Sequence, residues 1–180
     1  MRAVLDTCVI YPTVMREMLL GAAGLGHFTP LWSARILEEW ARAAVKLGPD
    51  GEAQARAEIA ITRTAWPQAE VAPAPGVQAR LWLPDPADIH VLATAVAGSA
   101  DTIVTLNRAD FPRNLLAEEG LDRIDPDTML MQFWQDAPEG IEALGSKVLG
   151  EANRLSGREW EMRPLLKKAR LPRLAKALSA

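Results

Sequence analysis

The sequence predicts an α/β fold in which a parallel sheet is covered by helices on both faces. Short runs of branched apolar residues alternate with stretches whose apolar residues recur at helical spacing. Strands that alternate with helices pair in parallel and are joined by right-handed crossovers. The 180 residues of the chain have the size of one domain, which buries roughly 70% of the surface that the unfolded chain exposes.

The composition indicates a soluble protein of a reducing compartment. Cys8 is the single cysteine, so no internal disulfide can form. No N-terminal segment resembles a signal peptide, and no apolar run approaches the ~18 residues of a membrane span. We therefore expect a cytoplasmic protein that has no membrane partner.

Local signals define the elements of the first half of the chain. A helix over residues 12–24 begins with a proline and ends with a glycine. Ser33 is a good N-cap for a second helix, which Gly48 terminates. A third helix is expected over 51–65, because this segment is rich in helix formers. The strands of this half are expected at residues 2–6 and 28–32.

The second half continues the alternation of helices and strands. Residues 66–77 are loop-like, with a short strand near Val71. A turn followed by an apolar helix is expected over 83–98. Asp125 and Pro126 suit the N-cap and first position of a later helix. Further elements are expected as strands at 101–106 and 121–124 and as a helix over 141–155.

We expect two parts in the chain, an α/β domain over residues 1–134 and a helical, basic extension over 135–180. From Arg163 onward the chain carries six basic residues and no acidic one. Such an asymmetry is typical of contact with nucleic acid or an acidic partner, and also of a solvated helix. Leucines between Leu165 and Leu178 form an apolar stripe that would pack on the domain or on a second protomer.

Acidic side chains from distant parts of the chain are expected to gather at one edge of the sheet. In a parallel α/β fold the functional crevice lies outside the carboxyl ends of the strands. Asp6 ends the first strand, and other acids follow later strands or begin the helices beside them. The residues expected near this edge are Asp6, Glu38, Glu39, Asp85, Asp88, Asn107 and Asp110.

Electrostatics predicts a divalent cation among these acids. Two carboxylates ~4 Å apart repel by about 4 kcal/mol at an effective dielectric constant of ~20. Ligation by oxygen atoms alone favours Mg²⁺ or Mn²⁺ over Zn²⁺. His27 and His90 are too far apart in the sequence for a local zinc motif, and His90 is expected to be at a helix surface or partly buried.

Each acid except Asp6 also has an ordinary structural role. Asp85 and Asp88 would cap a helix and complement its dipole. Glu38 would be a solvated helix residue, and Asp110 would shape a turn. An ordinary structural role explains Asp6 less readily, because it ends an apolar strand with no turn glycine beside it.

The stretches VLDTCVIYP, SARILEEWARA, LPDPADIHVLATAVAGSADTIVT and NRADFP together resemble the PIN-domain ribonucleases, which include the VapC-type toxins of bacterial toxin–antitoxin pairs. The resemblance spans about residues 1–130. It implies a Rossmann-like three-layer α/β/α sandwich whose acids bind Mg²⁺ or Mn²⁺ and hydrolyse RNA. It further implies an RNA substrate, a cognate antitoxin protein and a possible homodimer as partners.

The resemblance also implies site residues, position by position. Asp6, Glu39 and Asp88 match three of the family's acids. Where many relatives have a fourth acid, this chain has Asn107, and Asp110 lies three residues further on. The expected catalytic set is therefore Asp6, Glu39, Asp88, Asp110 and Asn107, with the four acids as metal ligands.

Neighbouring residues are expected to support this set. The family's usual Asn after the Asp-Thr pair is here Cys8. Hydroxyls of Thr7, Ser33 and Thr105 would orient the carboxylates, whereas Asp85 and Glu38 stay outside the metal-binding set.

Two other functions stay open at this stage. A haloacid-dehalogenase-like phosphatase also has an acid after its first strand, although it needs a second acid where this chain has Cys8. A catalytically degenerate PIN-like binding module is the non-enzymatic alternative, because Asn107 replaces an acid.

Overall fold

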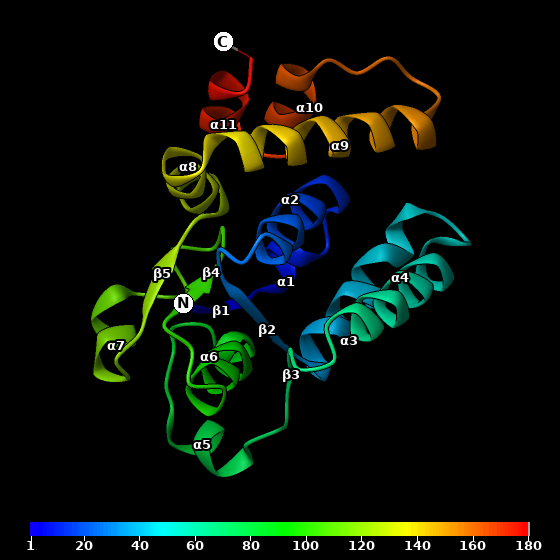
Figure 1. Ribbon diagram of the computed structural model, residues 1–180. Coiled ribbons are helices and arrows are strands. Elements are labelled where there is room, and N and C mark those ends of the chain that lie inside the picture. Colours follow the sequence, from blue (N-terminus) through cyan, green and yellow to red (C-terminus); the bar gives the residue numbers. More distant parts are fainter. Residues whose placement is uncertain (180) are drawn as a thin grey trace. The chain divides into compact units, whose positions relative to one another are not determined.

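A five-stranded sheet in the order β3-β2-β1-β4-β5 organises the computed structural model, which describes residues 1–179 (Figure 1). β1 pairs in parallel with both β2 and β4, and β2 pairs in parallel with β3. The α/β class, the parallel sheet and the C-terminal helices predicted from the sequence are confirmed. The strands are β1 (Arg2–Leu5), β2 (Thr29–Ser33), β3 (Glu70–Val71), β4 (Thr102–Val104) and β5 (Asp122–Ile124).

The central strands are apolar because they are buried on both faces. Val4 and Leu5 of β1 are fully buried, as are Ile103 and Val104 of β4. Val4 lies beside Ile103, and Leu5 beside Val104. Continuous runs of branched apolar residues are typical of parallel strands that are covered on both sides.

The chain forms two compact units. The first consists of residues 1–11 and 29–123, and the second of residues 12–28 and the chain from residue 124 onward. The expected boundary between residues 134 and 135 stays a prediction. Among residues 1–179, no helix is both long enough and apolar enough to cross a membrane.

Helices of the first unit follow the local signals at most positions. The hydroxyl of Ser33 accepts a hydrogen bond from the backbone of Ile36 (3.2 Å) and so caps α3 as predicted. The prediction of a loop at the start of α5 is wrong, because Pro75 begins that helix at its first turn. The helices are α1 (Thr7–Ile10), α3 (Ala34–Ala43), α4 (Gly51–Ala65), α5 (Pro75–Arg80), α6 (Ile89–Ala97) and α7 (Arg113–Glu118), with the 3₁₀ turns η1 (Ala44–Leu47) and η2 (Pro86–Asp88).

The second unit consists of helices that bury an apolar core. α2 packs against α8 and α9, and a Cβ atom at Gly21 would overlap the side chain of Leu144, so these helices approach closely. α10 packs on α9 and α11 on α8. Of the predicted leucine stripe of the tail, Leu165, Leu166, Leu171 and Leu174 are buried in this unit and Leu178 is half-buried. The helices are α2 (Thr13–Gly24), α8 (Pro126–Asp136), α9 (Pro138–Ser156), α10 (Met162–Lys168) and α11 (Pro172–Ala177).

A buried carboxylate fixes the start of α11. Asp127 is 5% exposed, and its two oxygens accept the backbone N–H groups of Arg173 (2.9 Å) and Leu174 (3.0 Å). These amides lie at the first turn of the helix, where backbone donors have no partner within the helix. Asp127 therefore joins α8 to α11.

Replacing Asp127 by Ala is expected to lower the free energy of unfolding by about 1–3 kcal/mol, because two amides lose their acceptor. Urea denaturation of the full chain measures this change. Asp136→Ala is the matched control, since Asp136 lies on the same helix with an exposed side chain. Equal unfolding midpoints for the two variants would contradict the assigned role of Asp127.

Candidate metal centre and active site

The site lies where the strand order of the sheet reverses. From β1 the chain runs through β2 to β3 on one side of the sheet, and β4 and β5 lie on the other side. Ligands of open α/β sheets bind outside the carboxyl ends of the strands at such a switch point. Asp6 directly follows β1 and Thr105 directly follows β4. The topology thus brings residues 99 positions apart into contact.

Asp6 ends β1 because its carboxylate caps the single turn of α1. The residue has extended backbone angles, and its Oδ1 accepts the N–H of Thr7 (2.7 Å). Its Oδ2 accepts the hydroxyl of Thr105 (2.7 Å) and the thiol of Cys8 (3.1 Å). The side chain is 6% exposed, so these donors fix its orientation. The expected support from Thr105 is confirmed.

Cys8 is a hydrogen-bond donor within this network. Its Sγ donates to Asp6 and accepts the backbone N–H of Leu106 (3.3 Å). Burial and the negative charge of Asp6 raise the pKa of the thiol to about 12. The thiol therefore stays protonated at neutral pH, and a protonated thiol is a poor nucleophile. Cys8 thus supplies a hydrogen bond to Asp6 at the position where the resemblance implies Asn.

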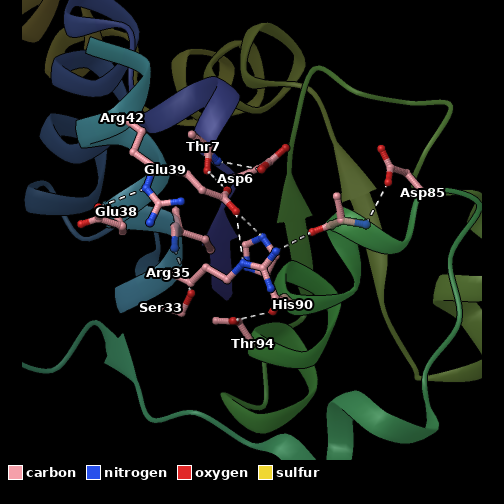
Figure 2. A network of polar contacts seen from close by, with 12 residues as sticks. Asp6, Thr7, Ser33, Arg35, Glu38, Glu39, Arg42, Asp85, His90 and Thr94 are labelled. Atoms are coloured by element: carbon pink, nitrogen blue, oxygen red, sulfur yellow. Dashed lines mark hydrogen bonds and ion pairs between the residues drawn. The ribbon is translucent and has the colours of Figure 1, made fainter. Parts of the chain in front are cut away.

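Glu39 of α3 is held by three side chains (Figure 2). Oε2 accepts the hydroxyl of Thr7 (2.8 Å), as expected for an orienting hydroxyl. Oε1 contacts Nε of Arg35 (3.3 Å) and Nε2 of His90 (2.8 Å). Burial favours the neutral carboxyl, but the contacts with His90 and Thr7 outweigh it and lower the pKa of Glu39. Glu39 is therefore ionised at neutral pH.

His90 differs from the sequence-based expectation. It is expected at a helix surface or partly buried, but in α6 it is 5% exposed. Its Nε2 lies 2.8 Å from Oε1 of Glu39 without the alignment of a hydrogen bond. Nδ1 has no hydrogen-bond partner within the described residues. The apolar character of α6 hides this position from sequence analysis, because a buried His gives the same helical pattern as a buried apolar residue.

Glu38 and Ser33 lie outside the network of Asp6 and Glu39. Glu38 pairs with Arg42 (3.2 Å) and Arg56 (2.9 Å). These hydrogen bonds lower the pKa of Glu38 to about 2. The expectation that Ser33 orients a carboxylate is wrong, because its hydroxyl caps α3. Of the two adjacent glutamates, Glu39 is the one that belongs to the site.

A second group of acids lies on η2 and on the loop after β4. One carboxylate oxygen each of Asp85, Asp88 and Asp110 lies within 4.8 Å of the other two. The amide of Asn107 lies 3.4 Å from Oδ2 of Asp88 and donates to Asp110. Asp110 and Asn107 are thus both beside Asp88. This acidic cluster, Asp85, Asp88 and Asp110, is a candidate cation site.

Sequence reasoning left Asp85 outside the expected set. Asp85 does cap η2, since its Oδ1 accepts the N–H of Ala87 (2.8 Å). It also shares the cluster, because one of its carboxylate oxygens lies within 4.8 Å of oxygens of Asp88 and Asp110. The i, i+3 spacing of Asp85 and Asp88 in a Pro-rich turn is the signal that could have identified it.

The carboxylates of the acidic cluster repel one another, and a bound divalent cation would relieve this repulsion. Burial, followed by the charges of Asp6, Asp85 and Asp110, raises the pKa of Asp88 to about 6. Hard oxygen ligands of this kind fit Mg²⁺ or Mn²⁺. Asp6 and Glu39 are not members of the cluster, so their role as metal ligands stays a prediction.

Comparison with known proteins identifies the fold family. Residues 2–109 match a family model described as the PIN domain. The matched segment includes Asp6, Glu39, Asp88 and Asn107, and it ends one residue before Asp110. No curated protein and no solved structure matches the chain.

The raised pKa of Asp88 predicts a stability that falls as the pH rises. The folded chain holds the proton up to about pH 6, whereas the unfolded chain releases it near 3.8. The stabilising contribution is therefore present below ~pH 4 and is lost as the pH rises through ~6. Asp88→Asn is expected to raise the Tm at ~pH 7.5 in EDTA and to leave it nearly unchanged at ~pH 4.

Thermal denaturation at the two pH values measures this difference. Glu38→Gln is the control of opposite sign, because the pKa of Glu38 is lowered to about 2 by its arginine partners. Losing that charge is not expected to raise the Tm at either pH. If Asp88→Asn and the wild-type chain have the same Tm at ~pH 7.5, the proposed repulsion is absent.

Proposed function

The chain belongs to the PIN domain family, and we propose that it is a metal-dependent endoribonuclease. PIN domains are generally nucleases, and the acidic cluster is a possible metal site typical of them. The observation that carries the proposal is the position of this cluster. Three carboxylates meet beside the switch point of the sheet, two of them inside the matched segment.

The proposed metal ligands are oxygen atoms of the acidic cluster together with Asp6 and Glu39. Asp88 is the central one, because it is close to Asp85 and Asp110 and because the negative charge of Asp6 helps to raise its pKa. A bound Mg²⁺ or Mn²⁺ would activate a water molecule and neutralise charge that develops on the phosphate. Asn107, beside Asp88 and Asp110, would supply a neutral oxygen atom to the metal or to its bound water.

The side chains around the acids hold them in place before any substrate binds. Thr7 couples two of them, since its N–H binds Asp6 and its hydroxyl binds Glu39. Thr105 and Cys8 hold the second oxygen of Asp6. Partners of this kind orient ligands and reduce reorganisation during reaction.

Water is the proposed nucleophile. The thiol of Cys8 stays protonated, because its pKa is about 12. Hydrolysis forms a bond between the water oxygen and phosphorus and breaks one phosphorus–oxygen ester bond. The water supplies a proton to the departing alkoxide, so the products are a phosphate monoester and a hydroxyl group.

The finer parts of the proposal concern substrate and partners. We propose that the substrate is RNA, that the chain is the toxin of a toxin–antitoxin pair in the cytoplasm, and that a cognate antitoxin binds it. Homodimerisation is part of the same proposal. The support for these parts is the resemblance of about residues 1–130 to the PIN-domain ribonucleases that include VapC-type toxins. The most specific stretch of that resemblance is residues 84–112.

The nuclease proposal predicts metal-dependent cleavage of single-stranded RNA. Mg²⁺ or Mn²⁺ should support cleavage, and EDTA should abolish it. Asp6→Asn, Glu39→Gln and Asp88→Asn are each expected to lower kcat by roughly 100-fold or more, the upper end of losses for groups that support a metal. Glu38→Gln should cleave at nearly the wild-type rate, because Glu38 pairs with Arg42 and Arg56.

Gel analysis of end-labelled RNA measures this cleavage, with circular dichroism as the test of folding. Cleavage that persists in EDTA or in all three variants would contradict the metal site. Hydrolysis of p-nitrophenyl phosphate without RNA cleavage would support the phosphatase instead. Binding of Mn²⁺ without cleavage of any RNA would indicate the degenerate binding module.

The toxin proposal predicts that expression of the chain arrests bacterial growth. Colony formation after induction is expected to fall for the wild type and to be restored by Asp6→Asn, with both proteins present at equal levels by immunoblot. Unimpaired growth with active wild-type protein would contradict the toxin role and leave the nuclease assignment in place.

A further inference from the structure

The last two helices present a basic surface. It consists of the exposed side chains Arg163, Lys167, Lys168, Arg170, Arg173 and Lys176, on and between α10 and α11. No acidic residue occurs from position 163 onward, whereas the preceding 162 residues carry 14 basic and 23 acidic side chains. A basic segment thus follows a strongly acidic one.

Packing explains why all six cations are exposed. Leu165 and Leu166 of α10 and Leu171 and Leu174 near α11 are buried in the second unit. α10 packs on α9, and α11 packs on α8 (Figure 1). The apolar side of this helical pair is therefore used inside the unit, and the charged side is left to solvent.

The charges of the basic surface are not neutralised within the chain. In the part of the chain that the structure describes, none of the six cations forms an ion pair with a carboxylate. Arg173 donates to the hydroxyl of Thr128 (3.0 Å), and the Lys168 ammonium lies 5.0 Å from the centre of the Trp160 ring. Three surface arginines elsewhere are paired in this way: Arg80 with Glu119, Arg113 with Asp122 and Arg154 with Glu151.

The character of the surface distinguishes between classes of partner. A protein interface has an apolar core surrounded by a polar rim. The large apolar side chains that are exposed all precede residue 156, so among residues 162–179 the basic surface has no such core. A phosphate backbone needs only cations and hydrogen-bond donors.

We propose that the basic surface binds the phosphate backbone of the nucleic-acid substrate, without reading its sequence. The inference rests on the proposed function, because it assumes a polyanionic substrate. It adds a source of affinity that the acidic cluster cannot supply, since carboxylates repel phosphates. Positive potential on the surface raises the local concentration of a polyanion and its association rate.

The test is the salt dependence of RNA binding by the full chain. A fluorescein-labelled, single-stranded RNA oligonucleotide is titrated in EDTA, so that no cleavage occurs, and anisotropy is measured at several KCl concentrations. The triple variant Arg163→Gln, Lys167→Gln, Lys176→Gln is expected to flatten the slope of log K against log salt by about 2, because each lost contact removes about 0.7. Within the described residues these three exposed side chains form no hydrogen bond or ion pair, so the fold should survive.

The matched control removes three positive charges elsewhere, by Arg80→Gln, Arg113→Gln and Arg154→Gln. These arginines are paired with carboxylates, so the slope should stay near that of the wild type although the net charge changes equally. A wild-type slope in the tail variant would overturn the proposal and favour an acidic protein as partner. A chain that binds RNA in EDTA but does not cleave it with Mn²⁺ would contradict the nuclease proposal and leave this one standing.

Discussion

Repulsion among carboxylates at the carboxyl ends of β1 and β4 is the constraint on which the site depends. Asp88 is surrounded by the charges of Asp6, Asp85 and Asp110, and together with burial they raise its pKa to about 6. A fold without a use for this arrangement would gain stability by losing one of the charges. The cost is understandable if a divalent cation neutralises the cluster when the protein works, as is typical of PIN domains.

The protein keeps these charges in place with donors from its own backbone and side chains. Asp6 is held by one amide, one hydroxyl and one thiol, and Glu39 by a hydroxyl, a guanidinium group and an imidazole. Thr7 contributes to both sets. Because Thr7 directly follows Asp6, its backbone N–H binds the acid at the end of β1 and its hydroxyl binds the acid of α3.

Short-range sequence patterns predict most of the helices and strands. They do not predict the site where one residue has both a capping role and a tertiary contact. The prediction for α4 agrees with the structure, because residues 51–65 are rich in helix formers. α1 was missed because one turn of four residues has no periodicity to detect. Asp85 was set aside as a cap, and it is one, but the tertiary fold also brings Asp110 to it. Such proximity depends on the path of the loop after β4, which no short-range pattern encodes.

The C-terminal helices complete the part of the fold that the family match leaves unfinished. α2 lies inside the matched residues 2–109, yet the helices it packs against, α8 and α9, lie beyond them. Met18 and Leu19 of α2 are fully buried, and the close approach at Gly21 requires Leu144 of α9. α8 and α9 therefore cover apolar surface of α2, the helix in the crossover between β1 and β2. The leucines of α10 and α11 are buried in the second unit, whereas the cations of these helices are exposed. One side of the two short helices therefore packs inside the unit, and the other, positively charged side is left for a ligand.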